Sequence, residues 1–267
     1  SRGCISGYLS RDIQELRSQE LNNRLDFIRE LYVDFDFNLD NGHIISTRLG
    51  KQQVIWGRTD LFRVLDVINP VDYSRNNIYD ELEDIRIPMW ILKTDYRMGA
   101  TDTFDDLNLQ LIWNFDRFRP NDLGQCGQPN VIVDAGCFFR GMNNLWENGG
   151  TVANFAGGTA ATDFGPGQIG IRQANLPSWS LSNTQVGLKF EGVLGDLGFS
   201  LNALNYRSQM PSLRGGIPAQ NGFNGEVAVW PALIAFDIEF PRITLVGGSM
   251  DYYSQSIDTV FRVEAAH

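Results

Sequence analysis

Residues 25–56 read LDFIRELYVDFDFNLDNGHIISTRLGKQQVIW, and apolar and polar side chains alternate along most of this stretch. Every odd position from 31 to 39 holds an apolar residue, and the even positions from 30 to 38 are mostly charged or polar. Successive side chains of a β-strand point to opposite faces, so the pattern predicts a strand with one apolar and one polar face. Residues 40–43 predict a tight turn that contains a glycine, and alternation resumes over 44–56. Together the two runs predict a long β-hairpin.

The same alternation recurs in six later segments, which brings the candidate strands to eight. The later segments are 90–97, 107–115, 185–190, 199–203, 242–252 and 259–265. The connections alternate in length: 40–43, 98–106, 195–196 and 253–258 are short, whereas 57–89, 117–183 and 208–241 are long. Short periplasmic turns and long external loops are typical of outer-membrane barrels. The sequence therefore predicts an all-β chain: an antiparallel transmembrane β-barrel of at least eight strands over residues 25–267, preceded by an N-terminal segment, 1–24.

We expect this barrel to be incomplete. The run 259–265 is still alternating when the sequence reaches His267, and no closing turn follows it. An eight-stranded barrel is filled by its own side chains, so it could not also hold the 57–89 loop. Further strands or a neighbouring chain would then complete the wall. A soluble antiparallel sheet, which also has one apolar face, is the competing interpretation.

The composition argues against nucleic-acid binding, a membrane-spanning helix and a metal or cofactor site. The chain has 267 residues and a net charge of -10, so it repels phosphates and nucleic acid is not an expected partner. With 43% hydrophobic residues it contains no uninterrupted apolar run of about 18 residues, which excludes a helical membrane span. Only two histidines and three cysteines are present, without a CxxC pair, so no metal site and no cofactor is expected.

Aromatic residues give a separate indication of a membrane. If the short turns are periplasmic, several aromatic residues fall near the outer ends of their strands, where an interfacial girdle would lie. These residues are Trp56, Trp90, Trp113, Phe115 and Tyr206. The alternative is that they are ordinary strand aromatics, because strands favour such residues in any case.

The loop 57–89 is the most distinctive of the long connections. It is dense in Arg and Asp interleaved with apolar residues, which suits a segment folded into a barrel lumen and tied there by Arg–carboxylate pairs. A solvated external loop is the alternative. The candidate lumen or transport residues are Asp34, Asp36, Asn38, Arg48, Gln52, Arg58, Asp60, Arg63, Asp66, Asn69, Asp72 and Arg86.

The cysteines predict one disulfide. Cys126 and Cys137 lie close together in a stretch rich in Gly, Asn and Pro within the 117–183 loop, whereas Cys4 stands apart. A bond between the first two would require an oxidising compartment. Two free loop thiols are the alternative.

Catalysis is not indicated by the sequence. A serine hydrolase needs a histidine near its serine, but His43 lies in a predicted turn, His267 is the last residue, and no GxSxG motif occurs. The pair Asp34 and Asp36 could share one strand face as an acid and a base do, although lumen polarity explains them more simply. We therefore expect no catalytic residues and no enzyme activity.

Several ordered motifs carry a resemblance to a known family. They read LGKQQVIWGRTD at 49–60, DVINPVD at 66–72, RIPMW at 86–90, DYY at 251–253 and DTVFR at 258–262. The chain resembles the DUF1302 family of Gram-negative outer-membrane proteins from about residue 25 onward. Members are typically longer, so this sequence resembles their front portion. The resemblance implies an outer-membrane location, trafficking of hydrophobic small molecules, and partnership with an outer-membrane lipoprotein and an RND-type exporter. It supplies no catalytic residues.

Three functions are compatible with the sequence. The first is a porin-like channel or transporter in the outer membrane. The second is a structural or assembly protein of the outer membrane or cell surface that binds partners through its long loops. The third is a soluble secreted β-protein that binds a ligand.

Overall fold

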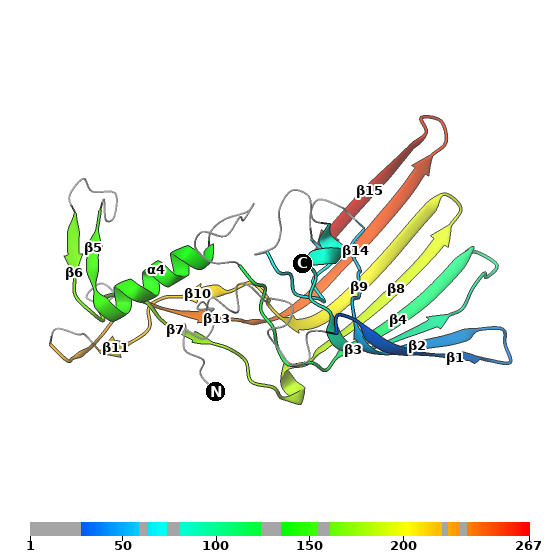
Figure 1. The fold of residues 1–267 in the computed structure, drawn as a ribbon. Coiled ribbons are helices and arrows are strands. Elements are labelled where there is room, and N and C mark those ends of the chain that lie inside the picture. Colours follow the sequence, from blue (N-terminus) through cyan, green and yellow to red (C-terminus); the bar gives the residue numbers. More distant parts are fainter. Residues whose placement is uncertain are drawn as a thin grey trace.

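The computed structural model describes residues 28–58, 63–73, 81–123, 135–153, 161–220, 224–229 and 234–267. Its main feature is an eight-stranded antiparallel sheet with the strand order β1-β2-β3-β4-β8-β9-β14-β15 (Figure 1). The strands are β1 (Leu31–Asn38), β2 (Ile44–Gln52), β3 (Met89–Arg97), β4 (Asp106–Asn114), β8 (Gln185–Leu194), β9 (Leu197–Arg207), β14 (Arg242–Ser254) and β15 (Thr259–Ala266). Each predicted alternating run supplies one of these strands, so the expectation of a β-rich chain with at least eight antiparallel strands is confirmed.

The short connections are those the sequence predicts. Gly42 in the first turn and Gly195 in the β8–β9 turn both have positive φ, at 83° and 58°. That backbone conformation carries no steric cost in glycine, so both turns can reverse the chain within a few residues. Figure 1 shows all four short turns at the same end of the sheet.

The sheet is open between its first and last strands. Among the described residues, β1 pairs only with β2, and β15 pairs only with β14. Pairing between 259–267 and 25–39 would contradict the expected incomplete barrel, and it is not seen in the described part of the chain. None of the described helices is long and apolar enough to span a membrane.

The inner face of the sheet is defined here as the face that carries residues 53–58 and 63–73, which are called the inward segment, and the outer face is its opposite. Ile112, Gly187 and Leu204 form one inner-face row across β4, β8 and β9. Trp56, Leu65 and Ile68 pack against this region in one buried cluster; its other members are Val54, Met89, Ile91, Ile112, Leu204, Tyr206 and Leu245. The inward segment therefore shares a core with the half of the inner face nearer the long connections.

This packing corrects two positions of the expected aromatic girdle. Trp56 is only 1% exposed and Tyr206 is also buried, so neither can face a surrounding solvent or lipid. β2 ends at Gln52, earlier than the predicted 56, because the chain then turns onto the inner face. There the Trp56 Nε1–H donates to Gln110 Oε1 over 2.6 Å, which satisfies the polar atom of a buried indole.

The long connections contain regular secondary structure. They carry α3 (Leu82–Ile85), α4 (Ala135–Asn148), β5 (Gly150–Val152), β6 (Thr162–Phe164), β7 (Ile169–Asn175), the 3-10 turn η2 (Leu181–Asn183), β10 (Ser212–Arg214), β11 (Ala219–Gln220), β12 (Val227–Ala228) and β13 (Ile234–Glu239). β10, β13 and β7 form a separate sheet in which β13 and β7 are parallel. α3 lies in the 57–89 connection.

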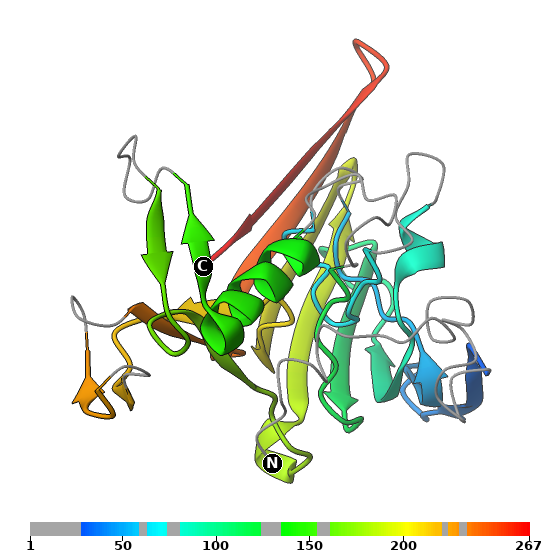
Figure 2. The same cartoon turned by 60° about the vertical axis from the view of Figure 1, so that its left-hand side comes forward.

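The unit around α4 lies beyond the end of the large sheet opposite the short turns, and Figure 2 brings it forward. Phe139 of α4 shares a buried cluster with Ile171 of β7 and Ile238 of β13. Gly170 allows the close approach, because a methyl group there would lie 2.2 Å from the carbonyl oxygen of Met142. A two-bond ion pair from Arg172 to Asp237 joins β7 to β13, and its hydrogen bonds raise the pKa of Arg172 above the ordinary value.

Packing at Gly187 gives a first prediction. A methyl group there would lie 2.5 Å from Trp56 Cη2 and 2.7 Å from Leu204 Cδ1, so Gly187→Ala should lower the free energy of unfolding by about 1–3 kcal/mol. Gly141→Ala is the matched control, because Gly141 is exposed in α4 and has nothing within 4 Å of the added carbon. The control should be neutral or more stable by about 0.5–1 kcal/mol. Urea unfolding followed by tryptophan fluorescence measures both, and equal stability of the two variants would contradict the described packing.

Candidate functional site

The candidate site is the polar half of the inner face, on the side of the short turns. Strand register places Ser46, Asp95, Gln110, Lys189 and Asn202 in one row across five neighbouring strands. The next row toward the short turns contains Asn108, Glu191, Ser200, Ser249 and Glu264. Because side chains two apart share a face, the alternation seen in the sequence brings these polar groups together.

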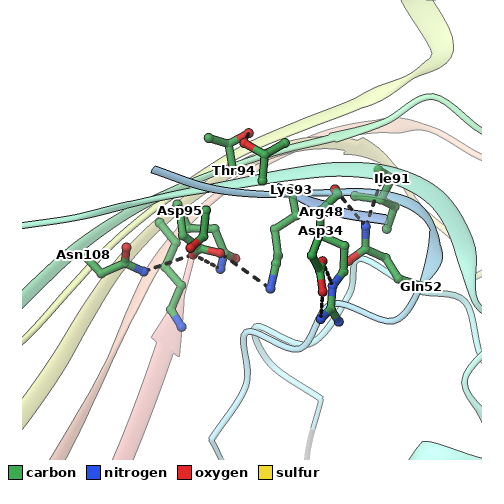
Figure 3. A network of polar contacts seen from close by, with 12 residues as sticks. Asp34, Arg48, Gln52, Ile91, Lys93, Thr94, Asp95 and Asn108 are labelled. Carbon is green, nitrogen blue, oxygen red and sulfur yellow. Dashed lines mark hydrogen bonds and ion pairs between the residues drawn. The ribbon is translucent and has the colours of Figure 1, made fainter. Parts of the chain in front are cut away.

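Asp95 is the centre of the first row. Its Oδ1 accepts hydrogen bonds from Gln110 Nε2 at 2.7 Å and from Asn108 Nδ2 at 3.1 Å, and Lys93 Nζ lies 3.6 Å from its Oδ2. Asp95 is only 4% exposed, so these three contacts compensate for the loss of water around its charge. Figure 3 shows Lys93 and Asp95 on one side of the strand and Thr94 on the other.

Glu191 links the two rows. Lys189 Nζ lies 2.5 Å from its Oε2, and Asn108 Nδ2 donates to its Oε1 over 3.0 Å. Arg58 NH2, from the inward segment, lies 3.7 Å from the same carboxylate. One hydrogen-bonded network therefore runs from β3 to β8 and reaches the inward segment.

Two amide oxygens in these polar rows can still accept hydrogen bonds. The Oδ1 atoms of Asn108 and Asn202 are covered by the protein but accept no hydrogen bond from it. Buried polar atoms are usually paired with protein or water, so both atoms could accept a bond from water or from a polar solute.

A second polar group fixes the inward segment on the long-connection side. Asn69 is fully buried; its Oδ1 accepts the Val54 N–H at 2.8 Å, and its Nδ2 donates to the carbonyls of Gln52 and Ile87. Gln209 Nε2 adds hydrogen bonds of 3.0 Å to the carbonyls of Val67 and Ile68. These amide groups satisfy backbone atoms of a segment without regular secondary structure, so the segment can be buried.

An ion-pair group lies next to Asn69. Asp66 Oδ2 accepts from Arg86 Nε at 2.9 Å and from Arg63 Nε at 3.2 Å, and Arg63 also donates to the Asn69 carbonyl at 2.7 Å. Asp66 and Arg86 are 4% and 5% exposed. This is a buried charge pair in which the loss of either partner leaves the other uncompensated.

The structure divides the sequence-predicted candidates into separate groups. Asp34 and Arg48 form an ion pair of 2.7 Å between β1 and β2, and the Ser46 hydroxyl donates to Asp36 in the next row. Asn38 is exposed at the β1 end near the turn, and Gln52 is buried with its amide donating to the Ile91 carbonyl. Arg63, Asp66, Asn69 and Arg86 form the group described above, whereas Arg58 lies with the later strands.

The remaining candidates stand apart. Asp72 forms an isolated parallel bridge with Asp122 rather than lining the polar rows. Asp60 lies outside the described residues, and so does Cys126; Cys137 lies in α4, but its side chain is not described. The Cys126–Cys137 disulfide therefore stays a prediction.

Sequence reasoning did not include Lys93, Asp95, Lys189, Glu191 and Asp251 among the candidates. The signal was present, because Lys93, Asp95 and Lys189 occupy polar positions of the same alternating runs. Which of the polar positions meet depends on register between strands that are far apart in the chain. Among the described residues, no group of three or more His, Cys, Asp or Glu side chains is arranged to hold a metal ion.

Comparison with known proteins gives one match. Residues 7–267 match the model of the family described as "Protein of unknown function (DUF1302)", so the chain belongs to that family, as the sequence motifs indicate. No curated protein and no solved structure matches the chain.

The ion pair at Asp66 gives a prediction. Asp66→Ala should lower the free energy of unfolding by about 3–5 kcal/mol, because it leaves the buried Arg86 guanidinium without a counter-charge. Asp34→Ala is the control, since Asp34 and Arg48 are 50% and 33% exposed and solvent already screens their attraction. Chemical denaturation should show a large shift for the first variant and a small one for the second. Similar shifts would contradict the buried position of the Asp66 pair.

Proposed function

We propose that this DUF1302 member forms the wall of an outer-membrane β-barrel and acts as a porin-like channel or transporter. The observation that carries the proposal is the chemistry of the outer face. One row across seven strands consists of Phe35, Thr47, Thr94, Leu111, Leu188, Ala203 and Val246. The next row on the outer face, toward the short turns, also carries no charged residue on six strands. It consists of Phe37, Ile45, Tyr96, Leu109, Phe190 and Leu201.

Many of these side chains are uncovered. Phe35, Leu111, Leu188 and Val246 are exposed, and Leu201 is 61% exposed. A soluble protein rarely leaves so continuous an apolar surface in water, whereas lipid-facing strands require one. This surface favours the membrane over the soluble ligand-binding alternative.

The inner face supports a route for solutes. Its polar half offers charged groups and unpaired amide oxygens, which suit water and polar groups, as in barrel interiors. Its apolar half is covered by residues 53–58 and 63–73, which share its core. The family resemblance implies that the cargo is a hydrophobic small molecule. Along this route, such a molecule would find apolar surface only on the half of the inner face that the inward segment covers.

An aromatic cluster supports a membrane boundary near the long connections. Trp113 and Phe115 have ring centroids 5.4 Å apart, and the Trp179 Nε1–H donates to the Phe115 carbonyl at 3.0 Å. Trp179 and Leu181 are 60% and 69% exposed. Exposed tryptophan at the end of lipid-facing strands suits the interface between acyl chains and head groups.

A role in binding partners is the second candidate. The unit formed by α4, β7, β10 and β13 has its own buried cluster and lies outside the large sheet. A folded unit of this kind could present a surface to an outer-membrane lipoprotein or an RND-type exporter, the partners implied by the resemblance. It is compatible with the channel proposal, because it uses a different part of the chain.

The lipid-facing assignment predicts a difference between the two faces. Phe35→Arg should lower stability in lipid vesicles by about 2–4 kcal/mol, because Phe35 lies near the middle of the outer face of β1. Ser46→Arg, on the inner face of β2 one row away, should have little effect since Asp36 and Asp95 lie beside it. Urea unfolding in vesicles measures both, and an unchanged stability of Phe35→Arg would count against a lipid-facing β1.

The channel function predicts ion flow. The full-length protein should produce discrete conductance steps in a planar lipid bilayer, since the inner face offers a hydrated polar surface. Heat-denatured protein in the same detergent is the control for leakage. Stable insertion without any conductance would favour the partner-binding role instead.

A further inference from the structure

Arg58 is the part of the inward segment that reaches the polar half of the inner face. Its NH1 group is paired with Asp251 Oδ2 on β14, and its NH2 group lies 3.7 Å from Glu191 Oε2 on β8. Its backbone N–H donates to Glu264 Oε1 on β15. Three carboxylates from three strands therefore meet one residue, and these four residues are called the Arg58 cluster below.

In the described part of the chain outside the Arg58 cluster, the inward segment is held by apolar packing and by amide hydrogen bonds, not by ion pairs with β8, β14 or β15. Trp56, two residues earlier, is in the apolar core. On the side of the long connections, hydrogen bonds of Asn69 and Gln209 hold the later part of the inward segment. Gly198 leaves room for Arg58, since a carbon added there would lie 3.1 Å from Arg58 NH1. Arg58 therefore spans from the segment to β8, β14 and β15 across the surface of β9.

The charges of the cluster are closely balanced. Glu191 also contacts Lys189 at 2.5 Å, and Asp251 lies 3.8 Å from Arg262. Among the described residues, the three carboxylates thus face three cations: Arg58, Lys189 and Arg262. Lys189 and Arg262 belong to wall strands, whereas Arg58 is the cation that would leave if the segment moved.

We propose that Arg58 closes the route along the inner face and masks its charge. With Arg58 in place, the segment is tied to β8, β14 and β15 and the carboxylates are neutralised. When this contact opens, carboxylates outnumber cations at that position, and the local field favours positively charged over negatively charged solutes. This inference rests on the proposed channel function.

The experiment compares wild type, Arg58→Gln and Arg48→Gln in planar bilayers under a KCl gradient. Arg48 is the matched control, because it lies on the same inner face and pairs with Asp34 but belongs to wall strand β2. Arg58→Gln should conduct more than wild type, with its reversal potential shifted toward the potassium equilibrium value. Arg48→Gln removes the same charge from the wall and should not raise the conductance, because Arg48 is not part of the closing segment, and Arg58→Lys should restore part of the wild-type behaviour.

Amide hydrogen exchange at position 58 is measured in parallel as a readout that does not depend on transport. It should rise about tenfold in Arg58→Gln, the factor that corresponds to losing one hydrogen bond to a charged group. Conductance and reversal potential equal to wild type in Arg58→Gln would overturn the proposal while leaving the channel intact. If exchange is faster in Arg58→Gln but no variant conducts, the channel function is refuted. Arg58 would then only anchor the inward segment, and the proposal would be overturned as well.

Discussion

The burial of residues 53–58 and 63–73 against the inner face is the interaction on which the rest of the structure depends. The open sheet would otherwise leave Ile91, Ile112, Leu204 and Leu245 uncovered, and Trp56, Leu65 and Ile68 supply the second side of that core. A backbone without regular structure can be buried there because Asn69 and Gln209 satisfy its polar atoms. The same segment brings Arg58 to the carboxylates of three distant strands. Core and polar network are therefore one arrangement, and the proposed role of Arg58 depends on both.

Much of the large sheet could be predicted, because each strand carries its own local signal. The alternation of apolar and polar residues predicts all eight strands, and Gly42 and Gly195 mark two of the turns between them. The predicted end of β2, at Trp56, is too late, because the run Val54-Ile55-Trp56 is as apolar as a strand and does not show that the chain leaves the sheet after Gln52. Trp56 and Tyr206 were assigned to the girdle for the same reason: a sequence shows that an aromatic lies near a strand end, but not which face its neighbours cover.

The other missed features depend on tertiary contacts. The sequence of α4, AGCFFRGMNNLWEN, contains two glycines and three asparagines, which are poor helix formers, and the helix is held by Phe139 and Asn143 against β7. The parallel pair β7–β13 joins residues more than sixty positions apart. At the candidate site, the sequence located Arg58, Asp66 and Arg86 in a segment suited to a lumen. It could not pair Arg58 with its partners, because register across β8, β14 and β15 decides which carboxylates Arg58 meets. The pairing of Asp66 with Arg86 depends on how their connection folds onto the sheet.

A membrane wall with one lipid-facing and one solvated face is the central claim. A spin-label scan along β8, residues 185–194, in lipid vesicles tests it most directly, because alternate positions must sample different environments. Accessibility to oxygen should peak at Val186, Leu188 and Phe190, and accessibility to a water-soluble nickel reagent should be low there. Gln185 and Lys189 should be shielded from the oxygen dissolved in the acyl chains. High accessibility of Val186, Leu188 and Phe190 to the nickel reagent, with no alternation in oxygen accessibility, would contradict the claim.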